Sequence, residues 1–483
     1  MILVAAIALP LIAGALLPAL RLKQGARLAY MLGVTLVTSA LVGVLLFSPE
    51  VERLDLIRFN EFLVVSLHLD GMGKVFAALA AFLWPLATLY ASEYMQLHRN
   101  QESFFAFYTM SYGITLGVAM SANLLTLYIF YEMMTLSTLP LVLHGGSPRA
   151  ISAGLKYLYY SLGGAAFAFM GMVYVLYFGG TTDFQWGGLF QHIARPHTAQ
   201  LQLGYLFCFL GFGVKAAVFP VHGWLVPASV APTPVTALLH AVAVVKAGVF
   251  SVMRATYFSF GVSILAGSYA QYIPLALAAF TIVYGSTMAL KEKHLKRRLA
   301  YSTIANLSYI LFGVLLMTPA GLAAGLLHMV FHALIKITLF LAAGAYMEKC
   351  HLESIQDLRG LGKNMPLTSL VFVIGGLALT GIPPLLGFVS KWALASSAVA
   401  QGGLLPYLGL AALIISAILT GTYMMVPSFM LYTGKRPPGA PEITPMGLPF
   451  QLTLIVLGLS LLVFSFWNGP LIDFLTRAAS GLA

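Results

Sequence analysis

The chain has 483 residues, of which 60% are hydrophobic and 8% charged, and its mean hydropathy is +0.90. Soluble globular domains carry about 25% charged residues, so this composition excludes a soluble fold and predicts an all-α, polytopic membrane protein. The net charge of +11 does not indicate nucleic-acid binding, because the basic residues sit in short loops, where they set topology. Cys208 and Cys350 form no CxxC motif, so we expect no metal site and no cofactor in this chain.

Apolar runs of about 20 residues, the length that crosses a bilayer as a helix, recur from end to end. Polar, Gly and Pro residues divide residues 1–483, a single membrane domain, into fourteen expected spans. They lie near 2–20, 27–47, 73–97, 104–121, 123–143, 154–178, 203–220, 232–254, 271–290, 299–317, 322–347, 367–394, 404–430 and 449–468. The first run lacks a basic leader and an obvious cleavage site, so we interpret it as a span and not as a signal peptide.

Two segments between or after the spans have a different character. Residues 48–72 alternate polar and apolar side chains and are too charged to span, so they predict a β-hairpin or loop outside the cytoplasm. The last stretch, GPLIDFLTRAASGLA, is short and amphipathic and is expected to lie at the membrane interface.

The loops carry an asymmetric charge. Loops after odd-numbered spans hold fifteen Lys and Arg residues, against four (Arg53, Arg58, Arg195 and Arg254) in loops after even-numbered spans. Cytoplasmic loops are enriched in Lys and Arg. We therefore expect the odd loops in the cytoplasm and both termini outside it, with the chain in the inner (plasma) membrane of a prokaryote.

Ionisable residues lie within several of the expected spans. The four that we single out first are Glu132, Lys215, Lys246 and Lys391. An ionised side chain at bilayer depth costs at least about 2.5–3.5 kcal/mol. Several such groups in one chain indicate an ion or proton path through the membrane.

Prolines interrupt two of these spans near a lysine. Pro220 follows Lys215, and Pro383 and Pro384 precede Lys391. Broken helices at membrane depth are tolerated where they line a cavity or are buried in protein, and a pair of them is typical of transporters built from inverted repeats. We expect the repeats at 104–254 and 271–430, each with five spans, and the prolines at points of gating or entry.

Glu132 is the expected partner of Lys215. Burial disfavours the ammonium form of a lysine, and a nearby carboxylate favours it. A Lys–Glu pair whose separation changes is therefore a proton switch. The alternative is a static buried ion pair that only fixes helix register.

Histidines extend this set. His328, His332 and Lys336 are spaced i, i+4, i+8 and so follow one slowly drifting helical stripe, which could relay protons. The alternatives for this stripe are helix packing or an HxxxH metal site without a third ligand. His240 is off the face of Lys246 and is a weaker relay candidate. His222, beside Pro220, is a candidate for capping the path, and a loop hydrogen bond explains it equally well.

Five strings together resemble the antiporter-like subunits of Mrp-type cation/proton antiporters, respiratory complex I and membrane-bound hydrogenases. They are YEMMTLSTLPLVL, the run from GFGVKAAVFPVHGWL to AVVKAGVFSVMR, HLKRRLAYSTIANLSYILFG, HMVFHALIKITLFLAAGAYMEK and LTGIPPLLGFVSKW. The resemblance covers residues 70–430. It implies fourteen helices, two inverted repeats, and a polar axis through Glu132, Lys215, Lys246, the span of His328, His332 and Lys336, and Lys391.

Two departures from the family pattern indicate which members of the family the chain resembles most. After the first break the family commonly reads HxWLPxAHxxAPSP, whereas this chain reads HGWLVPASVAPTP and lacks the second histidine. The chain also ends after its fourteenth expected span, without a long lateral helix. It is therefore most similar to the Mrp D-type or hydrogenase-type subunits.

The expected function is proton translocation by one subunit of a multi-subunit membrane complex. The driving force would be either Na⁺ or K⁺ exchange or a redox arm with Fe–S subunits. The expected partners, within the lipid bilayer, are small helical subunits and another antiporter-like subunit. The alternatives are a haem- or quinone-binding redox subunit, for which facing histidines on two helices would be needed, and an inactive membrane scaffold.

Overall fold

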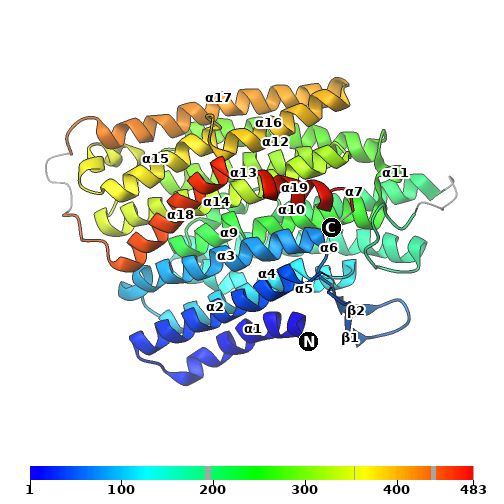
Figure 1. Cartoon of the computed structure of the whole chain (residues 1–483), viewed down its shortest axis with the longest axis horizontal. Helices are drawn as coiled ribbons and strands as arrows, with labels where there is room; N and C mark the ends of the chain where they lie inside the picture. The colour runs from blue at the N-terminus through cyan, green and yellow to red at the C-terminus, as the bar shows by residue number, and fades with distance from the viewer. Residues whose placement is uncertain (50, 191–196, 353, 437–441, 482–483) are drawn as a thin grey trace.

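The computed structural model describes residues 1–49, 51–190, 197–352, 354–436 and 442–481. Nearly all helices run along one direction and form a single bundle, with α1 along one edge and α17 along the other (Figure 1). In chain order the helices before the chain midpoint are α1 (Ile2–Leu20), α2 (Gln24–Phe47), α3 (Gly71–Tyr94), α4 (Gln101–Ala119), α5 (Leu124–Leu143), α6 (Pro148–Gly179), α7 (Thr198–Lys215), α8 (Leu225–Ala228) and α9 (Thr233–Ala241). They continue as α10 (Val244–Arg254), α11 (Val262–Leu265), α12 (Tyr269–Lys291), α13 (Leu295–Leu315), α14 (Pro319–Cys350), α15 (Pro366–Thr380), α16 (Leu386–Gln401), α17 (Leu404–Tyr432), α18 (Leu448–Phe466) and α19 (Gly469–Ala478).

The all-α membrane fold is confirmed. Within the described residues, ten helical segments are long and apolar enough to cross a bilayer. The other four expected spans are also helical, in α4, α7, α13 and α15–α16. These four are shorter or less apolar than the ten, because polar residues or a break interrupt them. The count of fourteen passes therefore stays a prediction.

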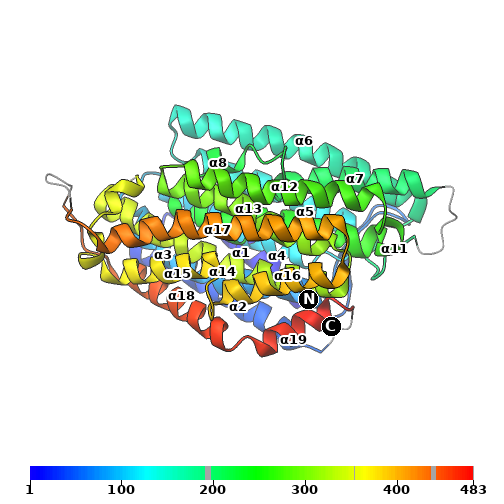
Figure 2. The ribbon, with the colours of Figure 1, turned by 90° about the horizontal axis from the view of Figure 1, so that it is seen from above.

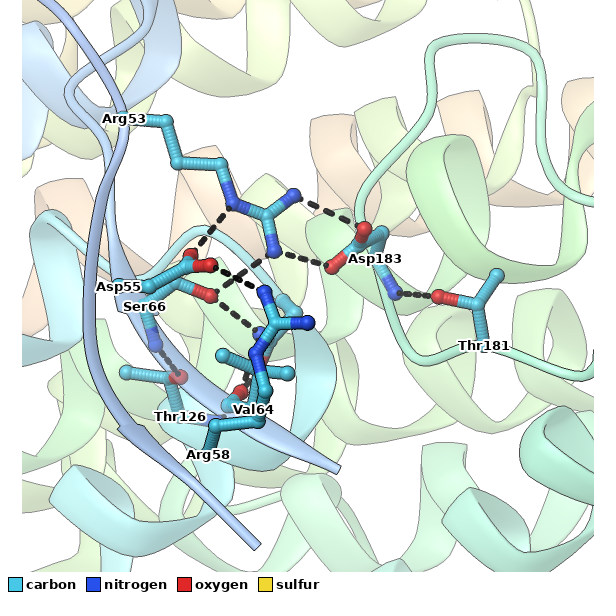
Figure 3. Close-up of polar contacts among 9 residues, drawn as sticks. Arg53, Asp55, Arg58, Val64, Ser66, Thr126, Thr181 and Asp183 are labelled. Atoms are coloured by element: carbon cyan, nitrogen blue, oxygen red, sulfur yellow. Dashed lines mark hydrogen bonds and ion pairs between the residues drawn. The ribbon is translucent and has the colours of Figure 1, made fainter. Parts of the chain in front are cut away.

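The predicted hairpin is present between α2 and α3. Strand β1 (Leu54–Arg58) pairs antiparallel with β2 (Val64–Leu67). Arg53 joins it to the loop after α6 through Asp183, with Nη1–Oδ2 and Nη2–Oδ1 distances of 2.8 and 2.9 Å (Figure 3). Both chain termini lie at the hairpin end of the bundle (Figure 1), as an even number of passes requires.

Three helices stop inside the bundle. The two breaks expected from proline are confirmed, between α7 and α8 and between α15 and α16. A third break, at Val242–Ala243 between α9 and α10, was not expected, and there the Ala243 N–H donates to the Leu238 carbonyl. The last turns before Gly261 form a π-helix, Ala255–Phe260.

Helix α14 forms the centre of the core. Nearly every residue from Gly321 to Tyr346 is buried, because α14 packs against α3, α9, α13, α15, α16 and α18. Figure 2 shows α6 along one edge of the bundle and α18 and α19 along the opposite edge. The amphipathic α19 lies against α3 and α14.

Three basic residues that the sequence assigns to loops are buried, and their assignment was wrong. The Arg254 guanidinium, 1% exposed, binds Asp70 through Nη1–Oδ2 and Nη2–Oδ1 distances of 2.5 and 2.6 Å. Lys296 donates to the Ala231 carbonyl at 2.7 Å, and Arg298 donates to the Tyr423 carbonyl at 2.8 Å. These side chains tie helix ends together, which also reduces their value as topology signals. Arg195 lies outside the described residues.

Candidate functional site

Lys215 and Glu132 meet where α7 ends beside α5. Asn123 caps α5 by accepting from the Thr126 N–H at 2.8 Å, which fixes the start of the helix two turns before Glu132. Lys215 is the last residue of α7 and is fully buried, with Nζ 3.8 Å from Glu132 Oε1. The same ammonium donates to the Tyr131 carbonyl and lies 3.3 Å from the centroid of the Tyr131 ring. Glu132 Oε1 is buried without a hydrogen-bond partner.

Backbone groups on both sides of the first break form hydrogen bonds with side chains of the protein. The Phe219 N–H donates to Thr281 Oγ1 at 3.1 Å, and the Trp224 indole donates to the Val214 carbonyl at 2.6 Å. His222 Nε2 lies 3.2 Å from the Tyr284 hydroxyl. Pro220 is exposed, so this break reaches the surface of the chain. Proline has no N–H, so its exposure leaves no donor unpaired.

Lys246 contacts His332 directly. Lys246 is the third residue of α10, just after the unexpected break, and neither side chain is exposed. The Lys246 Nζ lies 2.5 Å from His332 Nδ1. His332 Nε2 is buried without a partner.

His328 continues this line toward the second break. Its ring lies 5.9 Å from the His332 ring and 5.2 Å from the Tyr309 ring, centroid to centroid. His328 Nδ1 is 2.9 Å from Ser390 Oγ, and Nε2 is 3.3 Å from Asn306 Oδ1. Since Ser390 precedes Lys391, the contacts lead from Lys246 to α16.

Lys391 binds the end of the helix before the second break. Its Nζ donates to the carbonyls of Leu379 and Thr380 at 2.7 and 2.9 Å, so the ammonium of α16 caps α15. Pro383 and Pro384 in the loop between them are exposed. The second break therefore reaches the surface of the chain, as the first does, while its carbonyls are bound internally.

Two predicted residues lie beside this line. Lys336 donates to Leu299 O at 2.9 Å and to Ser302 Oγ, both on α13. His240 packs on the Phe340 ring at 4.8 Å, and both of its buried ring nitrogens lack a hydrogen-bond partner. In the part of the chain that the structure describes, no side-chain contact joins Lys215 to Lys246, although α7 and α10 pack together.

Sequence reasoning missed several polar neighbours of these lysines. Tyr131, Asn306, Tyr309 and Ser390 contact the lysines or the histidines directly. Position was the available signal, since Tyr131 precedes Glu132, Ser390 precedes Lys391, and the other two lie in the string NLSYILFG. Among the described residues no group of three or more His, Cys, Asp or Glu side chains could hold a metal ion.

Residues 121–420 match the family model described as NADH:quinone oxidoreductase/Mrp antiporter, transmembrane. The chain belongs to this family. Its matches include NADH-quinone oxidoreductase subunit N of Desulforudis audaxviator, with 32% identity over 85% of this chain and 83% of the relative. Another match is a subunit of the Na(+)/H(+) antiporter of Alkalihalophilus pseudofirmus, with 29% identity over 83% of this chain but 52% of that longer protein.

A solved structure shares the fold. A chain of the archaeal membrane-bound sulfane sulfur reductase superposes with a TM-score of 0.88 at 23% identity, covering 99% of this chain and 97% of that chain. Membership of the family confirms the resemblance drawn from the five strings. It also confirms that the chain is a multi-pass membrane protein.

Proposed function

We propose that this chain is a proton-translocating subunit of a multi-subunit membrane complex, in which H⁺ moves along the buried groups between Glu132 and Lys391. The observation that carries the proposal is the line of contacts from Lys246 through His332 and His328 to the neighbours of Lys391. It crosses the bundle from α10 to α16. The Glu132–Lys215 pair lies beyond it, separated from Lys246 by a step without a side-chain contact among the described residues but across the packed helices α7 and α10.

Neighbouring titratable groups influence one another's protonation through their charges. Two unit charges about 6–8 Å apart interact by about 2–3 kcal/mol at an effective dielectric constant near 20. A proton that arrives on one group therefore changes the charge that its neighbour favours. Glu132 and Lys215, 3.8 Å apart, form a lysine–carboxylate pair at one end of these groups, and its opening and closing would start or end each transfer. Lys336 and His240 would act as side branches, and His222, Pro220, Pro383 and Pro384 would lie at the entry points.

Replacement of Lys215 by alanine tests this function. The Lys215→Ala complex, reconstituted in vesicles, should assemble normally and lose coupled proton transport. Lys156→Ala is the matched control, because Lys156 is an exposed lysine of α6 in the same half of the chain, and this variant should keep transport. Wild-type pumping by Lys215→Ala would overturn the proposal.

The driving force defines two forms of the proposed function. One relative is named for a quinone oxidoreductase and the other for a sodium/proton antiporter, so a redox arm and cation exchange both have relatives in their favour. Mass spectrometry of the native complex distinguishes them. Fe–S or nickel-containing subunits would indicate a redox-driven pump, and only small membrane subunits with a second antiporter-like chain would indicate Na⁺ or K⁺ exchange.

The architecture of the proposed transporter has two further parts. Residues 104–254 and 271–430 would form inverted repeats, each with its broken helix as the fourth of five spans, and this equivalence supports the pairing of Lys215 with Lys391. Both termini would face away from the cytoplasm, as the basic loops indicate. A C-terminal reporter that is active only outside the cytoplasm should be active, and an inactive reporter would refute the orientation.

A further inference from the structure

An apolar groove of about 430 Å³ lies at the hairpin end of the bundle, on the side of α14 opposite His332. Helices α3 and α14 form its walls, and α18 and α19 close one side. The side chains that line it include Ala78, Leu79, Phe82, Val330, Leu334 and Phe474. The groove remains open to the surface along the exposed side of Phe82, which is 41% exposed.

A lysine stands at the mouth of this groove. Lys74 lies in the first turn of α3, and Ala78 and Phe82 follow it at i+4 and i+8 on the same face. The groove thus runs about 12 Å along α3 from the level of Lys74, at a rise of 1.5 Å per residue. Asp70 caps the helix, so Lys74 lies at the hairpin end of this apolar span, where its amine can reach a lipid headgroup.

The Lys74 ammonium has more N–H donors than its one hydrogen bond within the described residues uses. It donates to the Ser48 carbonyl at 3.0 Å, and an ammonium has three donors. The arginines of the same end are neutralised, Arg53 by Asp183, Arg58 by Asp55, and Arg254 by Asp70. Within the described residues, Lys74 has no carboxylate partner, so its charge is available to an anion.

We propose that this groove binds one acyl chain of an anionic phospholipid, whose phosphate contacts Lys74. An apolar slot that begins at a cation at the interface matches an amphiphile with one negative end. A whole partner helix, about 10–12 Å across with its side chains, is much bulkier than one acyl chain. A groove of about 430 Å³ therefore suits the acyl chain better. The volume is in the range of pockets that take small molecules. Lipid tails are as apolar as the lining, so the phosphate–Lys74 contact decides which lipid binds.

The bound chain would contact the central helix of the protein. Val330 and Leu334 line the groove, and they flank His332 at two positions on either side. Residues two apart point to nearly opposite faces of a helix. The lipid therefore packs against the back of the helix whose other face holds His332 on Lys246.

Lipid retention tests the proposal. The native complex is reconstituted in nanodiscs of equal parts phosphatidylglycerol and phosphatidylcholine, re-extracted, and its retained lipid measured by mass spectrometry. Lys74→Gln should lower retained phosphatidylglycerol about fivefold, the value of one basic side chain near a membrane surface. Lys23→Gln, an exposed lysine of the opposite end, is the control and should change nothing. Ala78→Trp should remove both lipids from the groove, while Ala166→Trp on an exposed face of α6 should not.

A photoreactive residue in place of Phe82 identifies the occupant independently. In the native complex it should give an adduct with the mass of a phospholipid. A cross-link to another protein of the complex would overturn the proposal and assign the groove to a protein partner. Unchanged lipid in both Lys74→Gln and Ala78→Trp would overturn it as well.

Discussion

Lys246 and His332 lie 2.5 Å apart, Nζ to Nδ1, and neither side chain is exposed. One nitrogen must donate and the other accept, so only one proton lies between the two facing atoms. The position of that one proton is therefore set jointly by α10 and α14, two helices that fall in different expected repeats, 104–254 and 271–430.

His332→Leu removes this partner and should abolish most coupled transport. The Lys246 amine would be left in an apolar setting, where an unsatisfied polar group costs about 1–3 kcal/mol. Proton uptake by reconstituted vesicles measures the effect. His222→Leu is a control at the surface break, and a smaller loss is expected there. Full transport by His332→Leu would refute a role for the pair.

Asp70→Asn should destabilise the protein strongly. It leaves the Arg254 guanidinium, 1% exposed and lying 4.5 Å from the Phe258 ring, without its carboxylate. Removal of one partner of a buried ion pair costs about 3–5 kcal/mol. Thermal unfolding in detergent measures this. Asp183→Asn breaks the exposed pair with Arg53 and should change stability by no more than about 1 kcal/mol. Equal shifts for the two variants would contradict the expectation.

The Asp70 pair also predicts a pH dependence. Burial disfavours the carboxylate, but the charge and hydrogen bonds of Arg254 outweigh burial and hold the pKa of Asp70 below its usual value. A lowered pKa stabilises the folded state at any pH above about 4, the pKa of Asp in the unfolded chain. This stability is lost as the pH falls through the lower pKa of the folded state. Unfolding temperatures of wild type and Asp70→Asn should converge below pH 4. A constant difference down to pH 2 would contradict this assignment.

Gly248→Ala should displace α10 from the first break. An added Cβ would overlap the backbone of Ala216 and Lys215, which cannot yield as a flexible side chain can. Overpacking of this kind costs about 1–3 kcal/mol. We expect lower transport and a lower unfolding temperature. Gly163→Ala on α6 meets open space and should leave both unchanged. Wild-type behaviour of Gly248→Ala would show that the two helices can separate freely.

Lys391→Met should loosen the end of α15. The carbonyls of Leu379 and Thr380 lose the ammonium that binds them. Hydrogen exchange of the amides near Gly381 should therefore become faster, and coupled transport should fall. Lys363→Met, at an exposed residue that ends a short 3-10 helix in the same half, should leave exchange at Gly381 unchanged. Unaltered exchange in Lys391→Met would rule out the capping role.

Much of this fold follows from local signals in the sequence. Apolar runs mark the helices, and the Pro220 and Pro383–Pro384 signals mark two breaks, because proline acts on its own helix. The third break has no such signal, since residues 235–247 contain neither Gly nor Pro. Packing among α9, α10 and their neighbours decides it, and a single sequence does not show that packing.

The candidate site was predictable by residue type but only partly by pairing, since the expected contact of Glu132 with Lys215 is present and most other partners were not foreseen. A lysine in an apolar run is visible at once, whereas its partner is distant in the chain, as His332 is from Lys246. For the same reason Arg254 was taken for a loop charge, because Asp70 lies 184 residues away. Lys336 follows His328 and His332 along α14, and its amine contacts α13, which the spacing alone did not show.

Because of the three breaks, the amines of Lys215, Lys246 and Lys391 belong to or contact residues at the end of a helix. Lys215 is the last residue of α7, and the amine of Lys391 sits on the last carbonyls of α15. Helix C-termini carry partial negative charge, so both sites favour an ammonium. Lys246 stands in the first turn of α10, where the partial charge is positive and disfavours one. For the proposed proton path, the helix ends thus favour a protonated lysine at Lys215 and Lys391 and disfavour one at Lys246, which lies between them.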